Sequence, residues 1–381
     1  KVSPPPDSRT GETRFTVQIS DNHSGFDPET IEFTVNGRTC RPGDTGVDLD
    51  LATGTCTVDW FATGHWPTER PASHALAVRL SAVNDLVGNH GRPREWSFTF
   101  DRQLDRKPPL APTVEWVDAD LACRYTFEPG QPAMDGRQVY DETLGTYVSR
   151  STAKKEGHSA SITIFKDVVD IAKHPCLTFR YRFPPQAKLD LLAHVLDPNR
   201  IRENMVIKLT DAFVYPDNNV IAGTLEDFVL DNEWHAAAID FRPYIMNCVK
   251  PGTGAAKNGN DNSSPVSNRA IKHLKFADAG ENWPPIETAY YFDDVQLQAP
   301  GPPKAQFRFA ADDAAGVSGF AWSMDRDSNT SPPPRINAAA NATVDIAFPE
   351  TGLWYVHARA VDGNGNWSQP GHFAYIVEGI E

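Results

Sequence analysis

Aromatic residues in polar, loop-like stretches are the side chains of this sequence best suited to holding a ligand. Trp283 lies in "DAGENWPPIE", and two tyrosines lie beside two arginines in "GRQVYDETLGTYVSR". A flat ring offers an apolar platform, and polar neighbours bond hydroxyl groups; a sugar requires both. The candidate binding residues are Trp283, Tyr140, Tyr147, Tyr215, Arg137 and Arg150. For each ring the alternative is a structural role, as a lid over the core.

Side chains that perform catalysis form no recognisable pattern in this sequence. It contains no GxSxG, no HExxH, no phosphate-binding loop and no GxGxxG that follows a strand. The eleven histidines are scattered, and none has metal-ligand spacing to a second. The two carboxylates of a glycoside hydrolase are recognised because they face each other across about 5–10 Å, which a sequence does not show. We therefore expect no enzymatic activity and rank a glycan-active enzyme third.

The acidic charge balance excludes two classes of partner. Asp and Glu number 50 against 36 Lys and Arg, which gives a net charge of −14. Nucleic acids and anionic membranes attract basic surfaces, so we expect neither as a partner. No apolar run approaches the ~20 residues of a membrane-spanning helix, so we expect no membrane insertion. The sequence begins at Lys1 without a signal peptide, which favours a processed chain or a part of a longer one.

Two of the five cysteines are placed to form a disulfide. Cys40 and Cys56 end the turn-rich stretch "TCRPGDTGVDLDLATGTC", which can fold back so that its ends meet. A bridge there would fit an exported protein, and two buried thiols are the alternative. The pairing of the other three cysteines, at positions 123, 176 and 248, stays open.

Two proline-rich stretches divide the chain into three parts. They are "DRQLDRKPPLAP", residues 101–112, and "QAPGPPKAQ", residues 298–306. Proline fixes φ and removes a backbone donor, so such stretches form stiff, extended connectors. The predicted domains are residues 1–103, 110–299 and 303–381.

The first and third parts repeat one phrase. "VRLSAVNDLVGNHG" in the first part matches "VHARAVDGNGNWS" in the third, and each precedes an alternating aromatic strand. A carboxylate can accept from nearby backbone N–H groups while Gly takes positive φ, so the phrase predicts a capped turn between sandwich strands. The alternative is calcium bound by Asp21, Asp85, Asp312 or Asp362, but a capped turn needs no metal.

These repeated segments resemble bacterial immunoglobulin-like or fibronectin type III-like modules. "AVNDLVGN" and "WYVHARAVDGNGNWS" look like the penultimate strand and final turn of such modules. The resemblance covers roughly 80–100 residues at each end and implies a two-sheet sandwich in both places.

The middle part is rich in short apolar strands. They include "SITIF", "CLTFRYRF", "NMVIKLT", "IKHLKFA" and "AYYFDDVQL", and helical periodicity is weak. Strands at this density over ~190 residues suggest a jelly-roll sandwich. The predicted fold class is therefore all-β, with three sandwich modules in series and the larger jelly roll at the centre. The residues expected in its core are Phe179, Phe183, Trp234, Phe241 and Phe276.

The middle part also resembles the galactose-binding-like jelly rolls found among carbohydrate-binding modules. It opens with "YTFEPGQ", closes with "YYFDDVQL" and carries "DNEWHAAAIDF" between them. The resemblance implies that the first and last strands are neighbours and that a structural calcium sits at their ends. Its ligands would be Glu128, Asp293 and the carbonyl of Gly130, and oxygen ligands of this kind suit calcium. Two solvated surface acids are the alternative.

Two hypotheses from different classes follow. The first is a non-catalytic glycan-binding and spacer region of a larger secreted or cell-surface bacterial protein, whose partner is a polysaccharide or glycoconjugate. The second is a purely structural or adhesive module, whose partners are other modules of the same protein or assembly. The first predicts an exposed aromatic patch in the middle module. The second predicts that Trp283, Tyr140 and Tyr147 are buried, with apolar contacts between modules.

Overall fold

The computed structural model describes most of the chain. The described residues are 1–21, 24–128, 131, 134, 136–152, 161–196, 202–215, 219–248, 270–278, 280, 285 and 287–379. Trp283 and Gly130 therefore lie outside the described residues. Within the described ranges, no helix has the length and apolar character needed to cross a bilayer.

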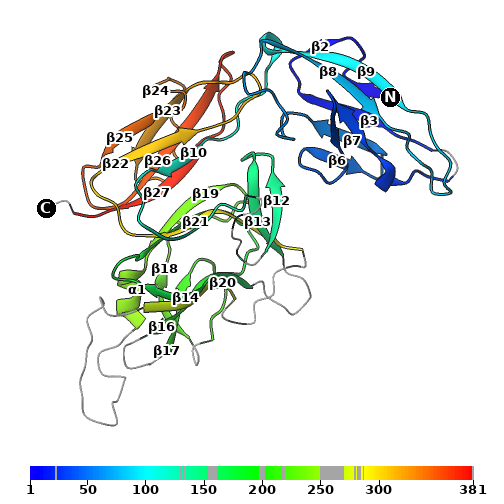
Figure 1. The fold of residues 1–381 in the computed structure, drawn as a ribbon. Helices are drawn as coiled ribbons and strands as arrows, with labels where there is room; N and C mark the ends of the chain where they lie inside the picture. The colour runs from blue at the N-terminus through cyan, green and yellow to red at the C-terminus, as the bar shows by residue number, and fades with distance from the viewer. Residues whose placement is uncertain are drawn as a thin grey trace, which may run out of the picture.

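The first module is a sandwich of two sheets (Figure 1). Its elements are β1 (Val2–Ser3), β2 (Arg9–Thr10), β3 (Arg14–Gln18), η1 (Pro28–Thr30), β4 (Phe33–Val35), β5 (Arg38–Cys40), β6 (Val47–Asp50), β7 (Thr55–Asp59), β8 (Ser73–Leu80), β9 (Arg94–Asp101) and η2 (Arg102–Leu104). The strand orders are β1-β3-β7-β6 and β2-β9-β8-β4-β5. Buried and exposed residues alternate along β3, β8 and β9, so each sheet turns one apolar face inward.

The middle module is a larger two-sheet sandwich with one helix. Its elements are β11 (Leu121–Tyr125), β12 (Arg137–Asp141), β13 (Thr146–Thr152), β14 (Ser161–Asp170), β15 (Cys176–Arg182), β16 (Asp190–Leu196), β17 (Arg202–Lys208), β18 (Val220–Thr224), β19 (His235–Asp240), α1 (Phe241–Cys248), β20 (Ala270–Ala277) and β21 (Ala289–Gln298). One sheet has the order β12-β13-β21-β15-β19, with β11 also on β21, and the other has the order β14-β20-β16-β17-β18. The expected all-β fold class is confirmed.

The first and last strands of the jelly roll lie side by side, as the resemblance implies. β11 pairs with β21 in antiparallel register from Leu121↔Gln298 to Tyr125↔Val295. The core between the two sheets holds four of the five predicted core residues, including Phe241, the first residue of α1. Trp234 differs: it is only partly buried and packs on the outer face of the β21 sheet.

The third module is a sandwich that uses a strand from before the jelly roll. Its strands are β10 (Thr113–Trp116), β22 (Lys304–Ala310), β23 (Val317–Asp325), β24 (Ala338–Ala339), β25 (Thr343–Ala347), β26 (Gly352–Asp362) and β27 (Gly371–Val377). The strand orders are β10-β22-β25 and β24-β23-β26-β27.

β10 corrects the expected boundary at residue 110. The strand pairs with β22 from Thr113↔Ala310 to Trp116↔Phe307. Val114 and Trp116 are buried in the core of the third module because alternate residues of β10 face it. The jelly roll, from β11 to β21, is therefore inserted between two neighbouring strands of the third sandwich.

The repeated phrase forms the same capped turn in both outer modules, as the sequence predicts. The Asp85 carboxylate accepts from the backbone N–H groups of Val87 and Asn89 at 3.0 and 2.7 Å, and Asp362 accepts from those of Asn364 and Asn366 at 2.8 and 2.9 Å. The glycines at 88 and 365 take φ of 91° and 85°, a conformation that Gly adopts without a steric cost.

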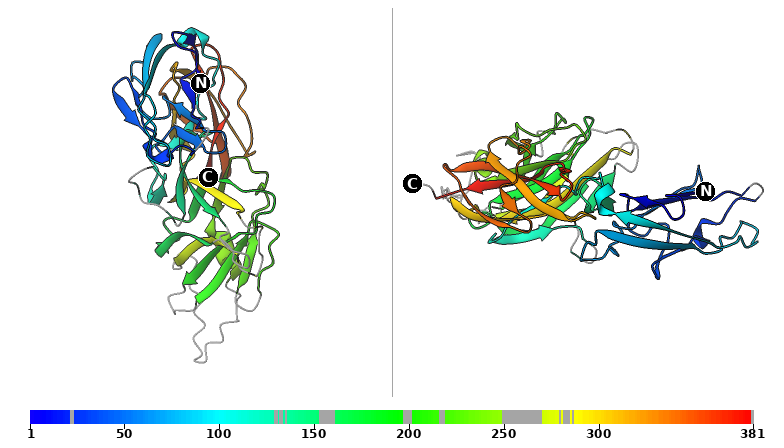
Figure 2. Two further views of the ribbon diagram at one scale, coloured as in Figure 1. Left: turned by 90° about the vertical axis from the view of Figure 1, so that its right-hand side faces the viewer. Right: turned by 90° about the horizontal axis from the view of Figure 1, so that it is seen from above.

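The jelly roll and the third module pack face to face, and the first module reaches to one side of this pair (Figures 1 and 2). Small residues on β15 and β19 let the sheets approach closely. The contact residues are Cys176, Ala236, Ala238, Tyr355, Ala374 and Ile376. The contact is apolar and buried, which fixes the two modules as a unit.

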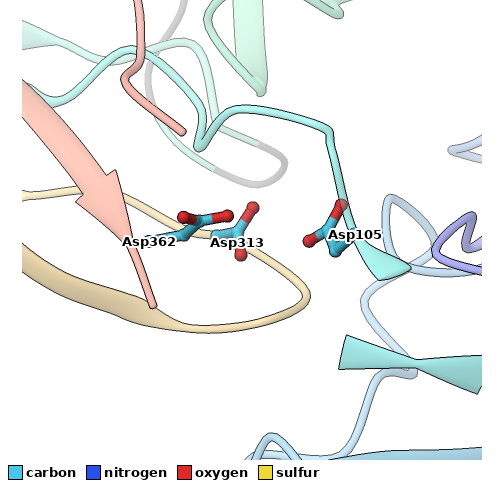
Figure 3. Close-up of side chains that lie close together, drawn as sticks. All are labelled: Asp105, Asp313 and Asp362. Atoms are coloured by element: carbon cyan, nitrogen blue, oxygen red, sulfur yellow. The ribbon is translucent and has the colours of Figure 1, made fainter. Parts of the chain in front are cut away.

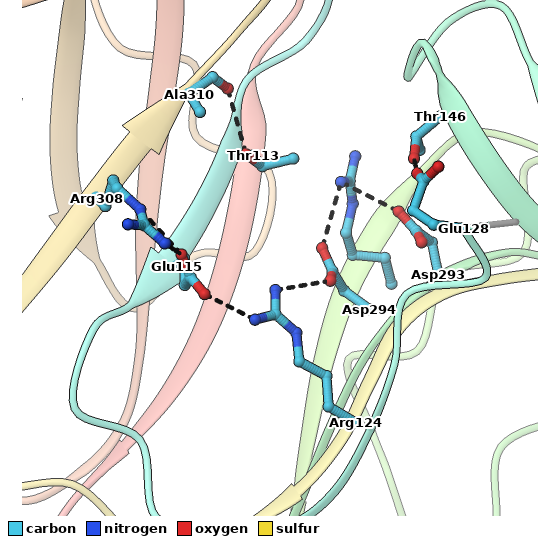
Figure 4. Close-up of polar contacts among 10 residues, drawn as sticks. Thr113, Glu115, Arg124, Glu128, Thr146, Asp293, Asp294, Arg308 and Ala310 are labelled. Atoms are coloured by element: carbon cyan, nitrogen blue, oxygen red, sulfur yellow. Dashed lines mark hydrogen bonds and ion pairs between the residues drawn. The ribbon is translucent and has the colours of Figure 1, made fainter. Parts of the chain in front are cut away.

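A chain of alternating charges crosses the same contact (Figure 4). Glu115 of β10 accepts from Arg308 of β22 and, at 2.7 Å, from Arg124 of β11. Arg124 also meets Asp294 at 3.3 Å, and Asp294 lies 3.9 Å from Arg180. Networks of partly buried charges favour one arrangement of their partners, so these residues fix the angle between the modules.

Candidate functional site

An open cleft of ≈ 590 Å³ lies on the jelly roll where several connecting loops meet. The loops follow β15, β17 and β18, and Pro285 closes the rim before β21. Apolar lining residues include Leu209, Phe228 and Leu230, and polar ones include Gln186, Lys188, Asp211 and Glu226. A mixed lining and a volume in this range are typical of sites for small ligands or short chain segments.

Phe228 forms an aromatic floor for the cleft. Its ring stacks on Tyr181 with centroids 4.0 Å apart and planes 9° apart, and it meets Phe183 edge-on at 5.4 Å. The Tyr181 hydroxyl accepts from the N–H of Val229 at 2.8 Å, which fixes the loop that carries the ring. Phe228 itself remains partly exposed, so the cleft presents a rigid apolar surface supported from beneath.

A buried carboxylate sets the opposite wall. Asp190 is fully buried and accepts from the N–H groups of Leu209 and Thr210 at 2.9 and 3.1 Å, while the Lys208 ammonium lies 3.1 Å away. These contacts hold the loop after β17 and direct its next residue, Asp211, to the rim. Hydrogen bonds to a buried charge are stronger than those between neutral groups, so the wall is well anchored.

The segment after that wall exposes two aromatic rings. Phe213 and Tyr215 are 60% and 40% exposed, and their rings meet edge-on at 5.5 Å. Between them Val214 is buried against Val206 on the outer face of the sheet. The alternation fixes both rings on the solvent side. Tyr215 is a predicted binding residue; Phe213 was missed, although the pattern of "DAFVYP" contains the signal.

Tyr140 and Tyr147 are directed toward the first module instead. They are paired on β12 and β13 and meet edge-on at 5.5 Å. The Tyr147 hydroxyl bonds with the Thr45 hydroxyl of the first module. Burial and the negative charge of Asp59 raise the pKa of Tyr140 to about 12. These two rings therefore lie at the contact with the first module and do not line the cleft.

Arg137 and Arg150 face each other on β12 and β13 and do not line the cleft. Arg150 lies 6.0 Å from the ring centre of Tyr291, and Arg182 covers the same ring at 3.9 Å. Trp234 lies 5.2 Å from Arg182. This row of arginines and rings lies beside the linker residue Ala111, on the face of the sheet that meets the other modules.

The predicted calcium residues are partly brought together (Figure 4). Glu128 accepts from the Thr146 hydroxyl, and its charge acts on Asp293. Burial raises the pKa of Asp293 well above its usual value, although Arg180 lies 3.4 Å away. The guanidinium already supplies a positive charge, and the acids described there, which include Asp294, do not bring three ligand atoms within 4.8 Å of one another. Calcium at this place stays a prediction, because Gly130 lies outside the described residues.

Cys40 and Cys56 are free thiols in the structure rather than a disulfide. Both are buried in the core of the first module, Cys40 on β5 and Cys56 on β7, and each belongs to a different sheet. Burial is the main cause that raises the pKa of Cys56, and the charge of Cys40 adds to it. The disulfide therefore stays a prediction.

Comparison with known proteins gives little further information. No family model and no curated protein matches the chain. Among solved structures, the glycoside hydrolase domain of Endo-D from Streptococcus pneumoniae is 9% identical over 66% of this chain, with a TM-score of 0.23. This chain spans 37% of that one.

Two further similar structures are built from β-domains or come from a cell surface. A carbohydrate-binding module of the β-sandwich superfamily is 12% identical over 77% of this chain and 94% of its own, with a TM-score of 0.22. The S-layer protein SbsC is 10% identical over 97% of this chain and 53% of its own, with a TM-score of 0.16. All three TM-scores are too low to carry an argument about fold or function.

Proposed function

We propose that the chain is a non-catalytic glycan-binding region of a secreted or cell-surface bacterial protein. The observation that carries the proposal is the cleft with its Phe228 floor, beside the exposed pair Phe213 and Tyr215 on a segment held by a buried carboxylate. Exposed rings on a rigid support stack on the apolar faces of sugar rings, and the acidic and amide groups of the rim bond hydroxyls. The ligand is a polysaccharide or glycoconjugate.

The outer modules serve in this proposal as immunoglobulin-like or fibronectin type III-like spacers. Trp283 precedes the rim residue Pro285 by two positions in the sequence, which keeps it among the binding residues. Structural calcium at Glu128 and Asp293 is part of the same proposal.

A structural or adhesive role is the second candidate. Its supporting observation is that Tyr140 and Tyr147 belong to a contact between modules, as this hypothesis predicts for rings that do not bind sugar. The two hypotheses differ in what happens when the exposed rings are removed, because a spacer does not need them.

The test is retention on polysaccharide. Each ring contributes ~1 kcal/mol of stacking, so Phe213→Ala with Tyr215→Ala should weaken binding about tenfold or more. Trp283→Ala should also weaken it. The melting temperature of the Phe213 and Tyr215 double variant should change little, because substitutions of exposed side chains usually have small effects on stability. Leu86→Ala, which removes an equally exposed apolar side chain from the first module, is the matched control.

Glycan arrays and affinity electrophoresis measure the binding, and assays for released reducing ends measure hydrolysis. Unchanged retention in the double variant would contradict the proposed site. Absence of any glycan bound by the parent chain would favour the structural role, and release of reducing ends would show an enzyme.

A further inference from the structure

Three buried carboxylates meet where the first module, its linker and the third module come together (Figure 3). Asp105 follows η2, Asp313 lies between β22 and β23, and Asp362 ends β26. Their exposed fractions are 1%, 5% and 2%. One potential ligand oxygen from each lies within 4.8 Å of the others. Among the described residues, this is the one group of three or more acidic, His or Cys side chains with such spacing.

Among the described residues, no basic side chain forms an ion pair with these carboxylates. Lys107, two residues after Asp105, pairs with Asp59 at 3.2 Å, and its charge offsets only part of the effect of burial on Asp105. The charges that act on Asp313 come from Asp105, Asp362 and Asp312, all of them negative, and together with burial they raise its pKa to about 7. Burial likewise raises the pKa of Asp105. Burying like charges together is strongly unfavourable unless a cation or protons neutralise them.

One oxygen of the cluster has no partner. Asp105 Oδ1 accepts from the N–H of Lys107 at 2.9 Å, whereas the buried Oδ2 finds no hydrogen bond within the described chain. Buried polar atoms nearly always have a partner, so this oxygen indicates a missing one. A cavity of ≈ 10 Å³ beside Asp105 and Asp313 has room for one particle the size of a water molecule.

We propose that Asp105, Asp313 and Asp362 bind one calcium ion that joins the first module to the third. Only oxygen donors are present, and they favour a hard cation. Calcium takes about six to eight oxygens in a flexible geometry, whereas magnesium demands a near-ideal octahedron, so carboxylates from three separate segments favour calcium. Water completes the coordination.

The ligands are held in place before the ion arrives. Asp313 accepts from the N–H of Ala315 at 2.7 Å, and Asp362 is held by the capped turn that follows β26. Fixed carboxylates lose little freedom on binding, which favours affinity.

The surrounding contacts show what the ion would stabilise. The Trp66 indole N–H of the first module donates to the Ala314 carbonyl at 3.2 Å, and the Asn364 amide donates to the Arg102 carbonyl at 2.6 Å. Both contacts flank the three carboxylates and cross from the first module or its linker to the third. Calcium at the centre would remove the repulsion that opposes this contact.

The chain supplies a matched control. Asp85 makes the same capped turn in the first module, but it is partly exposed and lies outside any such cluster. Asp85→Asn therefore removes one turn carboxylate without touching the proposed site.

The experiment titrates calcium into the full chain after EDTA treatment and dialysis. Calorimetry should show one calcium ion bound at this cluster in each chain. The melting temperature should rise by about 5 °C or more when the calcium concentration is about a hundred times Kd. Asp105→Asn and Asp313→Asn should each bind one ion fewer than the parent, and Asp85→Asn should bind the same number as the parent. Without calcium, Asp105→Asn should melt no lower than the parent, because the substitution relieves repulsion.

Several outcomes would overturn the proposal. They are a parent chain that binds no calcium at millimolar concentration, an unchanged number of bound ions in Asp105→Asn and Asp313→Asn, and the loss of one ion in Asp85→Asn. Glu128→Gln tests the other predicted calcium site. If this substitution alone abolishes the rise in melting temperature with calcium, the ion that causes the rise lies in the jelly roll. Should one variant fail to fold, the other is read by terbium emission excited through Trp66.

Discussion

Replacing Asp190 tests whether a buried carboxylate builds the wall of the cleft. Its side chain is fully buried and accepts from the N–H groups of Leu209 and Thr210, from the Thr210 hydroxyl at 3.5 Å and from the Lys208 ammonium, whose side chain is 15% exposed. Removing one partner of a buried ion pair costs about 3–5 kcal/mol, because the other charge stays desolvated. The two backbone groups lose their acceptor as well, at about 1–3 kcal/mol each before relaxation. These terms overlap, so we expect about 4 kcal/mol for Asp190→Ala.

In a module of this size, 1 kcal/mol corresponds to about 2–4 °C, so the jelly-roll transition should fall by about 8–16 °C. Asp190→Asn keeps an acceptor oxygen and should cost less, about 2–3 kcal/mol. Glycan binding should weaken in both, because the loop that carries Asp211 to the rim loses its anchor. Differential scanning calorimetry of the full chain reports the transition.

Asp211→Asn is the matched control on the same loop. Asp211 also pairs with a lysine, Lys188, but its side chain is 83% exposed, and exposed pairs contribute less than about 1 kcal/mol. The argument from burial would be refuted if substitutions at positions 190 and 211 lowered the free energy of unfolding equally. It would also be refuted if Asp190→Ala lowered it by less than about 1 kcal/mol.

Two further predictions concern protons and thiols. Burial and the neighbouring His357 lower the pKa of His372 from 6.5 to about 3. At a pH between these two pKa values, His372 binds a proton in the unfolded chain but not in the folded chain. The free energy of unfolding should therefore fall by about 1.4 kcal/mol for each pH unit below pH 6.5. His372→Gln should flatten this part of a pH series of urea melts, and an unchanged slope would contradict it. Burial raises the pKa of Cys40 to about 11 and that of Cys56 to about 12, so iodoacetamide should label neither in the folded, reduced protein. Labelling of the folded protein, followed by peptide mass spectrometry, would contradict the burial. Alkylation after unfolding without reductant tests the predicted disulfide, because bonded cysteines stay unlabelled.

Features written within a short stretch of sequence were predictable. The capped turns at Asp85 and Asp362 depend on Asp, Gly and Asn within five residues, and both occur as expected. α1 was missed, although Asp240 accepts from the N–H of Arg242 at 2.9 Å, as an N-cap residue does. Its eight residues are too few to show a helical period beside the strands on either side.

Features that depend on distant segments were not predictable. The four residues of β10 show the alternation of any strand, and nothing local reveals that the partner β22 begins only after the whole jelly roll. Tyr140 and Tyr147 have the polar neighbours expected of a binding loop, but a sequence does not show which module covers a hairpin. The three acids at 105, 313 and 362 come from separate segments that only the packed modules bring together.

The position of β10 decides how the chain would respond to pulling. Once the contacts between the first and third modules have opened, a tension between the first module and the C-terminus enters the third sandwich at Thr113, where the hydrogen bonds between β10 and β22 resist it. The inserted jelly roll begins after β10 and ends before β22, so it bears no tension while these two strands stay paired. A load that passes along the chain would therefore reach the proposed binding cleft only after β10 had been stripped from its partner.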